Sequence, residues 1–290
     1  MSSPSPRIST TPKVVKPFIA DVLSNIALSS RPFSIEIIGE PDVGKSHFAD
    51  SFPKALHLDT EKKADITIEK FPQAGHIWKK VSKWDDIEDA VNWAVTQPDI
   101  KSVIIDNDDD IQDLAVEKWS DEHGGKRPIA FDAHGGVITV LYAQIYKMID
   151  DVKTAIENSG KYLVCTCRLK DEFIANINTG RRVRDGYKKF PWSLKMALWI
   201  KNGIPDKKSG QVMFKQYKFG EVVKNNFFGI DMKKTPPVTY KKPYVFDVSY
   251  EGICEEMLKP WGGTDGVPLS EENERILKEA GEWLKVKGLI

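Results

Sequence analysis

The residues best suited to do chemistry form one run, Gly39-Glu40-Pro41-Asp42-Val43-Gly44-Lys45-Ser46. It fits the pattern G-x-x-x-x-G-K-[ST] at every defined position. In such a loop the glycines let backbone N–H groups face phosphate oxygens, the lysine adds positive charge, and the serine hydroxyl is a ligand for Mg²⁺. A chance match in a chain of this length has odds of roughly 1 in 100. We therefore expect residues 39–47, ending with His47, to line a nucleotide site.

A second acidic element follows at a suitable distance along the chain. The apolar run at 102–105 ends in Asp106, as expected of a strand whose terminal carboxylate holds Mg²⁺ together with Ser46. The next residues, Asn107 to Asp110, are also polar, and we expect most of them to form a solvated loop or a helix cap. Asn107 or Asp108 remains an alternative neighbour of the metal.

The hydrophobic pattern indicates the elements that position these residues. Short apolar runs predict strands at 34–38, 55–58, 102–105, 162–166 and 196–200, and helical spacing predicts helices at 45–51, 84–94 and 137–156. Strands that alternate with helices predict an α/β fold, a mostly parallel sheet with helices on both faces.

The regions before and after this core have a different character. Residues 1–17 are rich in Ser, Thr and Pro and predict a disordered leader, followed by helical spacing at 18–28. Residues 201–260 predict a β-rich continuation, with strands at 211–217 and 244–248 and a short helix at 251–258. Residues 261–290 predict a linker and a terminal helix at 271–286.

Composition excludes several classes of protein. The 290 residues contain 42 Lys+Arg and 42 Asp+Glu, so the chain is not a strongly basic nucleic-acid binder, although a local basic patch remains possible in principle. Three cysteines and five scattered histidines predict neither a disulfide framework nor a structural zinc site. The chain has no apolar run of about 18 residues and no apolar signal-peptide core, so we expect a cytoplasmic protein without a membrane partner.

A third acidic strand end carries a resemblance to a known family. The run Leu56-His57-Leu58-Asp59-Thr60-Glu61, close behind the phosphate loop, resembles RecA-like P-loop NTPases, and phage and prokaryotic nucleotide-binding ATPases above all. The similarity covers about residues 33–200 in the order of elements. It implies an AAA-type, recombinase-like ATPase core that binds ATP and Mg²⁺, with Lys45 and Glu61 as catalytic residues and Glu61 preparing the attacking water. The alternative is a surface strand end, since Lys62 and Lys63 follow.

The same resemblance suggests where further polar groups act. It implies a γ-phosphate sensor at the end of the strand at 162–166, where this chain offers Thr166 or Arg168. Arg168 has an alternative as a surface residue paired with Asp171 or Glu172. RecA-like assemblies also extend a basic finger toward a neighbour's nucleotide. Lysines that follow in a late strand are candidates, or are simply exposed strand residues: Lys215, Lys218 and Lys224.

A basic, aromatic segment at 181–192 occupies the place of a single-stranded DNA-binding loop in RecA-like recombinases. Phosphate contacts require Lys or Arg and base stacking requires aromatic rings. The candidate DNA-binding residues are Arg181, Arg182, Arg184, Lys188 and Lys189. The alternative is a loop whose aromatic residues anchor it in the core.

These expectations together describe an ATPase of phage-like DNA recombination or replication. It would act as a homo-oligomer with a replication or recombination protein as partner, in the host cytoplasm if viral. The rival interpretations are a non-catalytic, nucleotide-gated scaffold and a packaging or partitioning motor.

Overall fold

The computed structural model describes most of the central chain. The described residues are 32–61, 75–126, 142–175, 177–185, 194–205, 212–225 and 248–254, with short pieces at 128, 130–131, 137–138, 230–231, 238–239, 244–245 and 282. The expected leader at 1–17, the expected helices at 18–28 and 271–286, and the candidate residues Lys188 and Lys189 lie outside the described residues, residue 282 excepted.

One eight-stranded sheet forms the centre of the protein, in the order β14-β11-β10-β1-β7-β4-β2-β3. The strands from β10 to β3 in this order run parallel, while β11 runs antiparallel to β10. The strand bounds are β1 (Ser34–Gly39), β2 (Ala55–Asp59), β3 (Ile77–Lys80), β4 (Ser102–Asp106), β7 (Tyr162–Cys167), β10 (Met196–Pro205), β11 (Val212–Asn225) and β14 (Tyr244–Val245). The predicted α/β fold with a mostly parallel sheet is confirmed.

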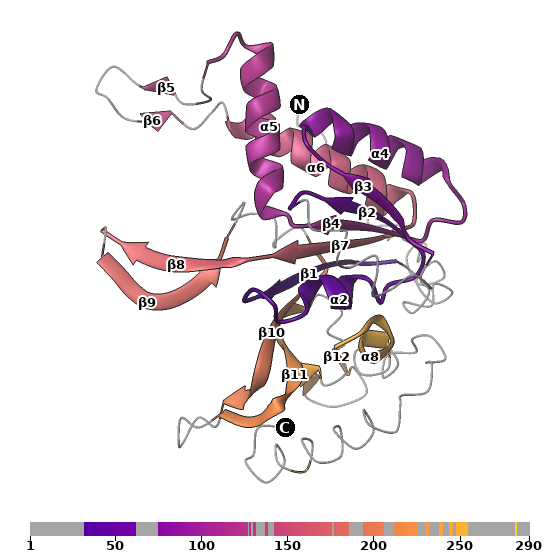
Figure 1. Ribbon diagram of the computed structural model, residues 1–290, viewed down its shortest axis with the longest axis vertical. Helices are drawn as coiled ribbons and strands as arrows, with labels where there is room; N and C mark the ends of the chain where they lie inside the picture. The colour runs from indigo at the N-terminus through magenta and orange to yellow at the C-terminus, as the bar shows by residue number, and fades with distance from the viewer. Residues whose placement is uncertain are drawn as a thin grey trace, which may run out of the picture.

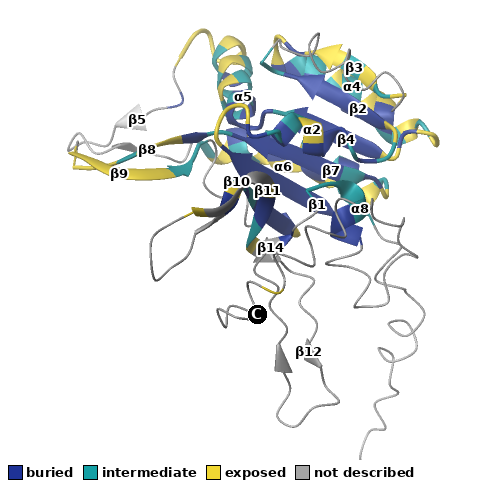
Figure 2. Cartoon of the chain, turned by 60° about the horizontal axis from the view of Figure 1, so that its bottom comes forward, coloured by how far each residue is buried: buried dark blue, intermediate teal, exposed yellow. Residues whose placement is uncertain are grey.

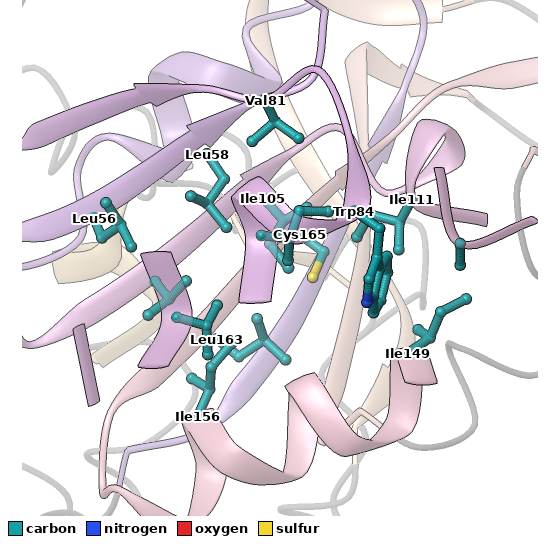
Figure 3. Packing of buried hydrophobic residues seen from close by; sticks show 14 of the residues in the cluster. Leu56, Leu58, Val81, Trp84, Ile105, Ile111, Ile149, Ile156, Leu163 and Cys165 are labelled. Carbon is teal, nitrogen blue, oxygen red and sulfur yellow. The ribbon is translucent and has the colours of Figure 1, made fainter. Parts of the chain in front are cut away.

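Three longer helices cover one face of the sheet (Figure 1): α4 (Trp84–Thr96), α5 (Asp109–Glu122) and α6 (Tyr142–Asn158). Their buried residues pack against strand residues such as Leu58, Ile105 and Leu163 (Figure 3). Trp84 and Ile149 reach into this cluster from α4 and α6. This apolar packing stabilises β2, β4 and β7, whose carboxyl ends lead to the candidate residues Glu61, Asp106 and Thr166.

Two short helices contribute to the opposite face. They are α2 (Lys45–Ala49) and α8 (Tyr250–Ile253), and a second buried cluster joins them to β1 and β10. Phe48 and Phe52 lie in this cluster, with ring centroids 6.0 Å apart. The strands between the two layers are almost wholly buried (Figure 2), as expected of parallel strands covered on both faces.

The structure differs from the sequence prediction in several elements. The helix expected at 137–156 begins at Tyr142, because Val137–Ile138 instead forms β6, paired with β5 (Ala130–Phe131); β-branched residues favour strands. Helix α5 begins in the acidic run that we expected to form a solvated loop or a helix cap, and the sequence predicted no helix after it. A hairpin of β8 (Leu169–Ile174) and β9 (Ile177–Arg184) projects from the end of β7 (Figure 1). A further small pair joins β12 (Ile230–Asp231) to β13 (Val238–Thr239).

Candidate functional site

Parallel strands bring the candidate residues to one edge of the sheet. The carboxyl ends of β1, β7, β4 and β2 lie side by side there, in the place where α/β proteins bind ligands. The register pairs Asp59 with Asp106 across β2 and β4. Because β7 lies between β1 and β4, its last residues lie between the end of β1, where the phosphate loop begins, and the end of β4, which carries Asp106.

The loop between β1 and α2 has the geometry that its sequence predicts. Gly44 has φ +97°, a left-handed conformation that glycine adopts without strain. A Cβ atom on Gly39 would lie 2.7 Å from Val43 Cγ1, so this glycine allows the tight turn. Since α2 contains only five residues, phosphate binding here depends on the loop and its lysine. His47 is exposed on α2.

Lys45 lies buried inside the loop. Its ammonium group donates to the carbonyl oxygens of Gly39 and Glu40, at 3.1 and 2.9 Å. Burial lowers the pKa of Lys45, and the nearby carboxylates of Asp106 and Glu61 oppose that shift. Lys45 of the phosphate loop therefore interacts electrostatically with both candidate carboxylates.

The carboxylate of Asp106 has three polar neighbours. Thr166 donates a hydrogen bond to it, Ser46 interacts with it, and the His57 Nε2 atom lies 3.6 Å from it. Burial opposes ionisation, but these neighbours lower the pKa of Asp106 overall. Thr166, a candidate sensor, is buried and orients this carboxylate.

The hydroxyl of Ser46 and the carboxylate of Asp106 fit a magnesium ion. Both offer hard oxygen ligands, which Mg²⁺ prefers, and Ser46 interacts with Asp106 beside the phosphate loop, which lowers the pKa of that carboxyl group. A lowered pKa keeps Asp106 in the ionised form that binds a cation.

His57 is a residue that the sequence analysis did not identify. It lies on β2, 1% exposed, between Asp106 and Asp50, whose carboxylate is 2.9 Å from its Nδ1 atom. The Trp78 ring stacks on the imidazole with centroids 3.9 Å apart. Burial opposes protonation, but the nearby carboxylate of Asp106 and the hydrogen-bonded carboxylate of Asp50 raise the pKa of His57. No spacing pattern in the sequence pointed to this contact.

Glu61 lies at the same edge, immediately beyond β2. The side-chain amide of Asn107 donates to its carboxylate, and the Arg168 Nη1 atom lies 3.4 Å away. Asn107 is itself fully buried, and its backbone N–H donates to the Thr60 hydroxyl at 2.8 Å. The polar residue after Asp106 therefore positions Glu61, a role that sequence reasoning did not assign to it.

Arg168 faces the acidic start of α5. Its guanidinium bonds Asp109 at 2.6 Å and Asp110 at 2.9 Å. These partners differ from the surface pairing with Asp171 or Glu172 that the sequence suggested. Since α5 starts beside β7, its first carboxylates are closer to Arg168 than the hairpin residues that follow in sequence.

Of the two alternatives expected for the acidic run, a solvated loop or a helix cap, the structure shows the cap, because Asp108 is the N-cap of α5. Asn107 and Asp108 are 0% and 4% exposed. Asp108 turns away from the phosphate loop toward Glu36 and Arg184, whose guanidinium also bonds Glu36 at 2.6 Å. Burial and the neighbouring Glu36 raise the pKa of Asp108 well above its ordinary value. One oxygen each of Glu36 and Asp108 has no hydrogen-bond donor among the described residues.

The basic candidates on the hairpin have different environments. Arg184 is inside the buried ion pair just described, with only 14% of its side chain exposed. Arg181 is exposed on β9. Arg182 is partly exposed and lies 3.1 Å from the Glu40 carboxylate of the phosphate loop. Of these three arginines, the structure leaves Arg181 and Arg182 accessible to a ligand.

Comparison with known proteins agrees with this geometry. A family model for the AAA domain matches residues 31–196, which include the phosphate loop, Glu61, Asp106 and the end of β7. No curated protein matches the chain. No helix among the described residues is long and apolar enough to cross a membrane. Because the matched segment covers more than half of the 290 residues, the chain belongs to the AAA domain family of P-loop ATPases.

Proposed function

We propose that this protein binds MgATP at the β1–α2 loop and hydrolyses it, using Glu61 to prepare the attacking water. The observation that carries the proposal is the convergence of Lys45, Asp106 and Glu61 at one sheet edge. The two carboxylates lie close enough to Lys45 to raise its pKa against the effect of burial. The loop amides and Lys45 bind phosphate, and Ser46 with Asp106 would hold Mg²⁺. The ion, when bound, neutralises charge on the phosphate oxygens.

Glu61 acts as general base or water-orienting residue in this proposal. A carboxylate in that role must be ionised and fixed within hydrogen-bonding reach of the attacking water. Asn107 and Arg168 supply the fixation, because both contact the Glu61 carboxylate. Thr166 contributes by orienting Asp106, and Arg168 is available as a γ-phosphate sensor once nucleotide draws it from its carboxylate partners.

The wider role that we propose is DNA recombination or replication, with single-stranded DNA as ligand. The support is the exposed hairpin. Arg181 is accessible to phosphate on β9, and Phe173 on β8 is 61% exposed and able to stack on a base. The Arg182–Glu40 ion pair places this hairpin against the phosphate loop, a contact through which DNA would influence turnover in a homo-oligomer.

A nucleotide-gated scaffold without turnover is the second candidate. One observation favours it: Glu61 is already engaged by Asn107 and Arg168 and must be released, at least in part, to contact water. A packaging or partitioning motor shares the ATPase chemistry with our proposal and differs in its partner, which turnover assays with DNA address.

The test is steady-state ATP turnover with and without single-stranded DNA, for wild type, Glu61→Gln and Arg181→Ala. We expect Glu61→Gln to bind ATP normally and to lose turnover by about 100-fold or more, the range for a removed general base. We expect Arg181→Ala to keep basal turnover and to lose DNA stimulation. Unchanged turnover in Glu61→Gln would overturn the role of Glu61, and tight ATP binding without turnover in wild type would favour the scaffold.

A further inference from the structure

The strand β11 brings a second lysine to the phosphate loop. The sheet pairs Gly39 at the end of β1 with Ile200 on β10, and Asn202 on β10 with Lys218 on β11. The antiparallel return of β11 therefore crosses the edge where the phosphate loop begins. Lys218 reaches the loop of its own chain, where a Cβ atom built on Gly44 would lie 2.8 Å from its Nζ atom.

The rest of the Lys218 side chain lies against the same residue. The Cδ and Cε atoms of Lys218 would be 3.8 and 3.9 Å from that Cβ position. The aliphatic part of the side chain and its ammonium group therefore both lie next to Gly44. Lys218 is exposed, and among the residues whose side chains the structure describes, none forms a hydrogen bond or ion pair with it. Its three donors thus lie beside the phosphate loop without an anionic partner among those residues.

The two lysines at the loop have different tasks. Lys45 is buried and bonded to the carbonyl oxygens of Gly39 and Glu40. Lys218 approaches from outside, at the residue immediately before Lys45. In loops of this sequence the backbone N–H groups hold the α- and β-phosphates, while the loop lysine reaches the β- and γ-phosphates.

We propose that Lys218 is a further nucleotide-binding residue, which contacts the α- and β-phosphates bound by the loop of its own chain. This inference rests on the proposed nucleotide site. It replaces the expectation of a finger directed at a neighbouring subunit by a contact within one subunit. Since the diphosphate is common to ADP and ATP, Lys218 strengthens the binding of both nucleotides to a similar degree.

The space beside this contact is large enough for the remainder of a nucleotide. A cavity of about 400 Å³ lies between the loop and β10, lined by residues 40–43 and 199–202. Lys218 pairs with one of these lining residues, Asn202, across β10 and β11. The lysine therefore stands where the cavity and the phosphate loop meet, as expected for a group that holds the diphosphate between nucleoside and γ-phosphate.

Equilibrium binding of fluorescent ADP and ATP analogues tests the proposal with Lys218→Met, Lys218→Arg and the control Lys195→Met. Lys195 is also an exposed lysine, at the other end of β10. Loss of a charge-assisted phosphate contact predicts about tenfold weaker binding of both nucleotides by Lys218→Met. We expect Lys218→Arg to restore most of the affinity and Lys195→Met to match wild type.

The outcomes separate this inference from the proposed function. If wild type binds and Lys218→Met binds equally well, the inference is overturned while the ATPase proposal stands. If wild type binds neither nucleotide, both are overturned. Mixing Lys45→Ala subunits with Lys218→Met subunits separates the two geometries: a contact within one subunit predicts no recovery of affinity, whereas recovery would place Lys218 in a neighbour's site and contradict the proposal.

Discussion

At the scale of single residues, the site is defined by how each carboxylate is held. Asp106 receives a hydrogen bond from Thr166 and lies beside Ser46 and His57, and these neighbours lower the pKa of Asp106 despite burial. Glu61 receives a hydrogen bond from Asn107. The motif predicted Lys45, Ser46 and Asp106 as neighbours because each belongs to a short pattern with a known geometry. His57 and Asn107 were not predicted in these roles, because their contacts join separate strands.

Asn107 provides the clearest test at this scale. Replacement by Ala removes the amide that orients Glu61, so we expect turnover to fall by about 10–100-fold while the dissociation constant for ATP changes little. Gln112→Ala removes another side-chain amide close by in sequence, on α5, and is the matched control. A large rise in the dissociation constant with unchanged turnover would contradict a positioning role for Asn107.

At the scale of elements, the β8–β9 hairpin is the feature that the sequence did not reveal. Its strands are mostly exposed and mix polar with apolar residues. They therefore lack the continuous apolar run that indicates a buried strand. Arg184 explains how this exposed element stays attached, because its guanidinium reaches the buried carboxyl groups of Glu36 and Asp108. Two residues 148 positions apart in sequence form this bond, and no local pattern could indicate it.

The anchoring role of Arg184 predicts a large loss of stability on substitution. Arg184→Met leaves Glu36 and Asp108 without their cation, and breaking a buried ion pair costs about 3–5 kcal/mol in the free energy of unfolding. Denaturant unfolding measures this loss. Arg181→Met removes an exposed arginine of the same strand, and we expect a change within about 0.5 kcal/mol. Equal stability of the two variants would show that the buried pair does not anchor the hairpin.

At the scale of the whole molecule, the strand order explains why the site is where it is. The apolar runs predicted β1, β2, β4, β7 and β10 correctly, because parallel strands buried on both faces have a continuous apolar sequence, whereas the mostly exposed β3 was not predicted. Their order was not predictable from those runs, since pairing depends on contacts that are distant in sequence. The order β10-β1-β7-β4-β2 brings the phosphate loop, Thr166, Asp106 and Glu61 to one edge. The strand β11 runs antiparallel to β10 and brings Lys218 to the same edge, next to Gly44 of the phosphate loop.

The most direct test of the central claim is phosphate release from ATP by the purified protein in the presence of Mg²⁺, compared with Lys45→Ala. Lys45 lies in the loop and donates hydrogen bonds to two of its carbonyl oxygens, so its loss removes phosphate-binding charge. We predict turnover by wild type and a loss of at least about 100-fold in Lys45→Ala. Equal phosphate release by the two proteins would contradict hydrolysis at this site.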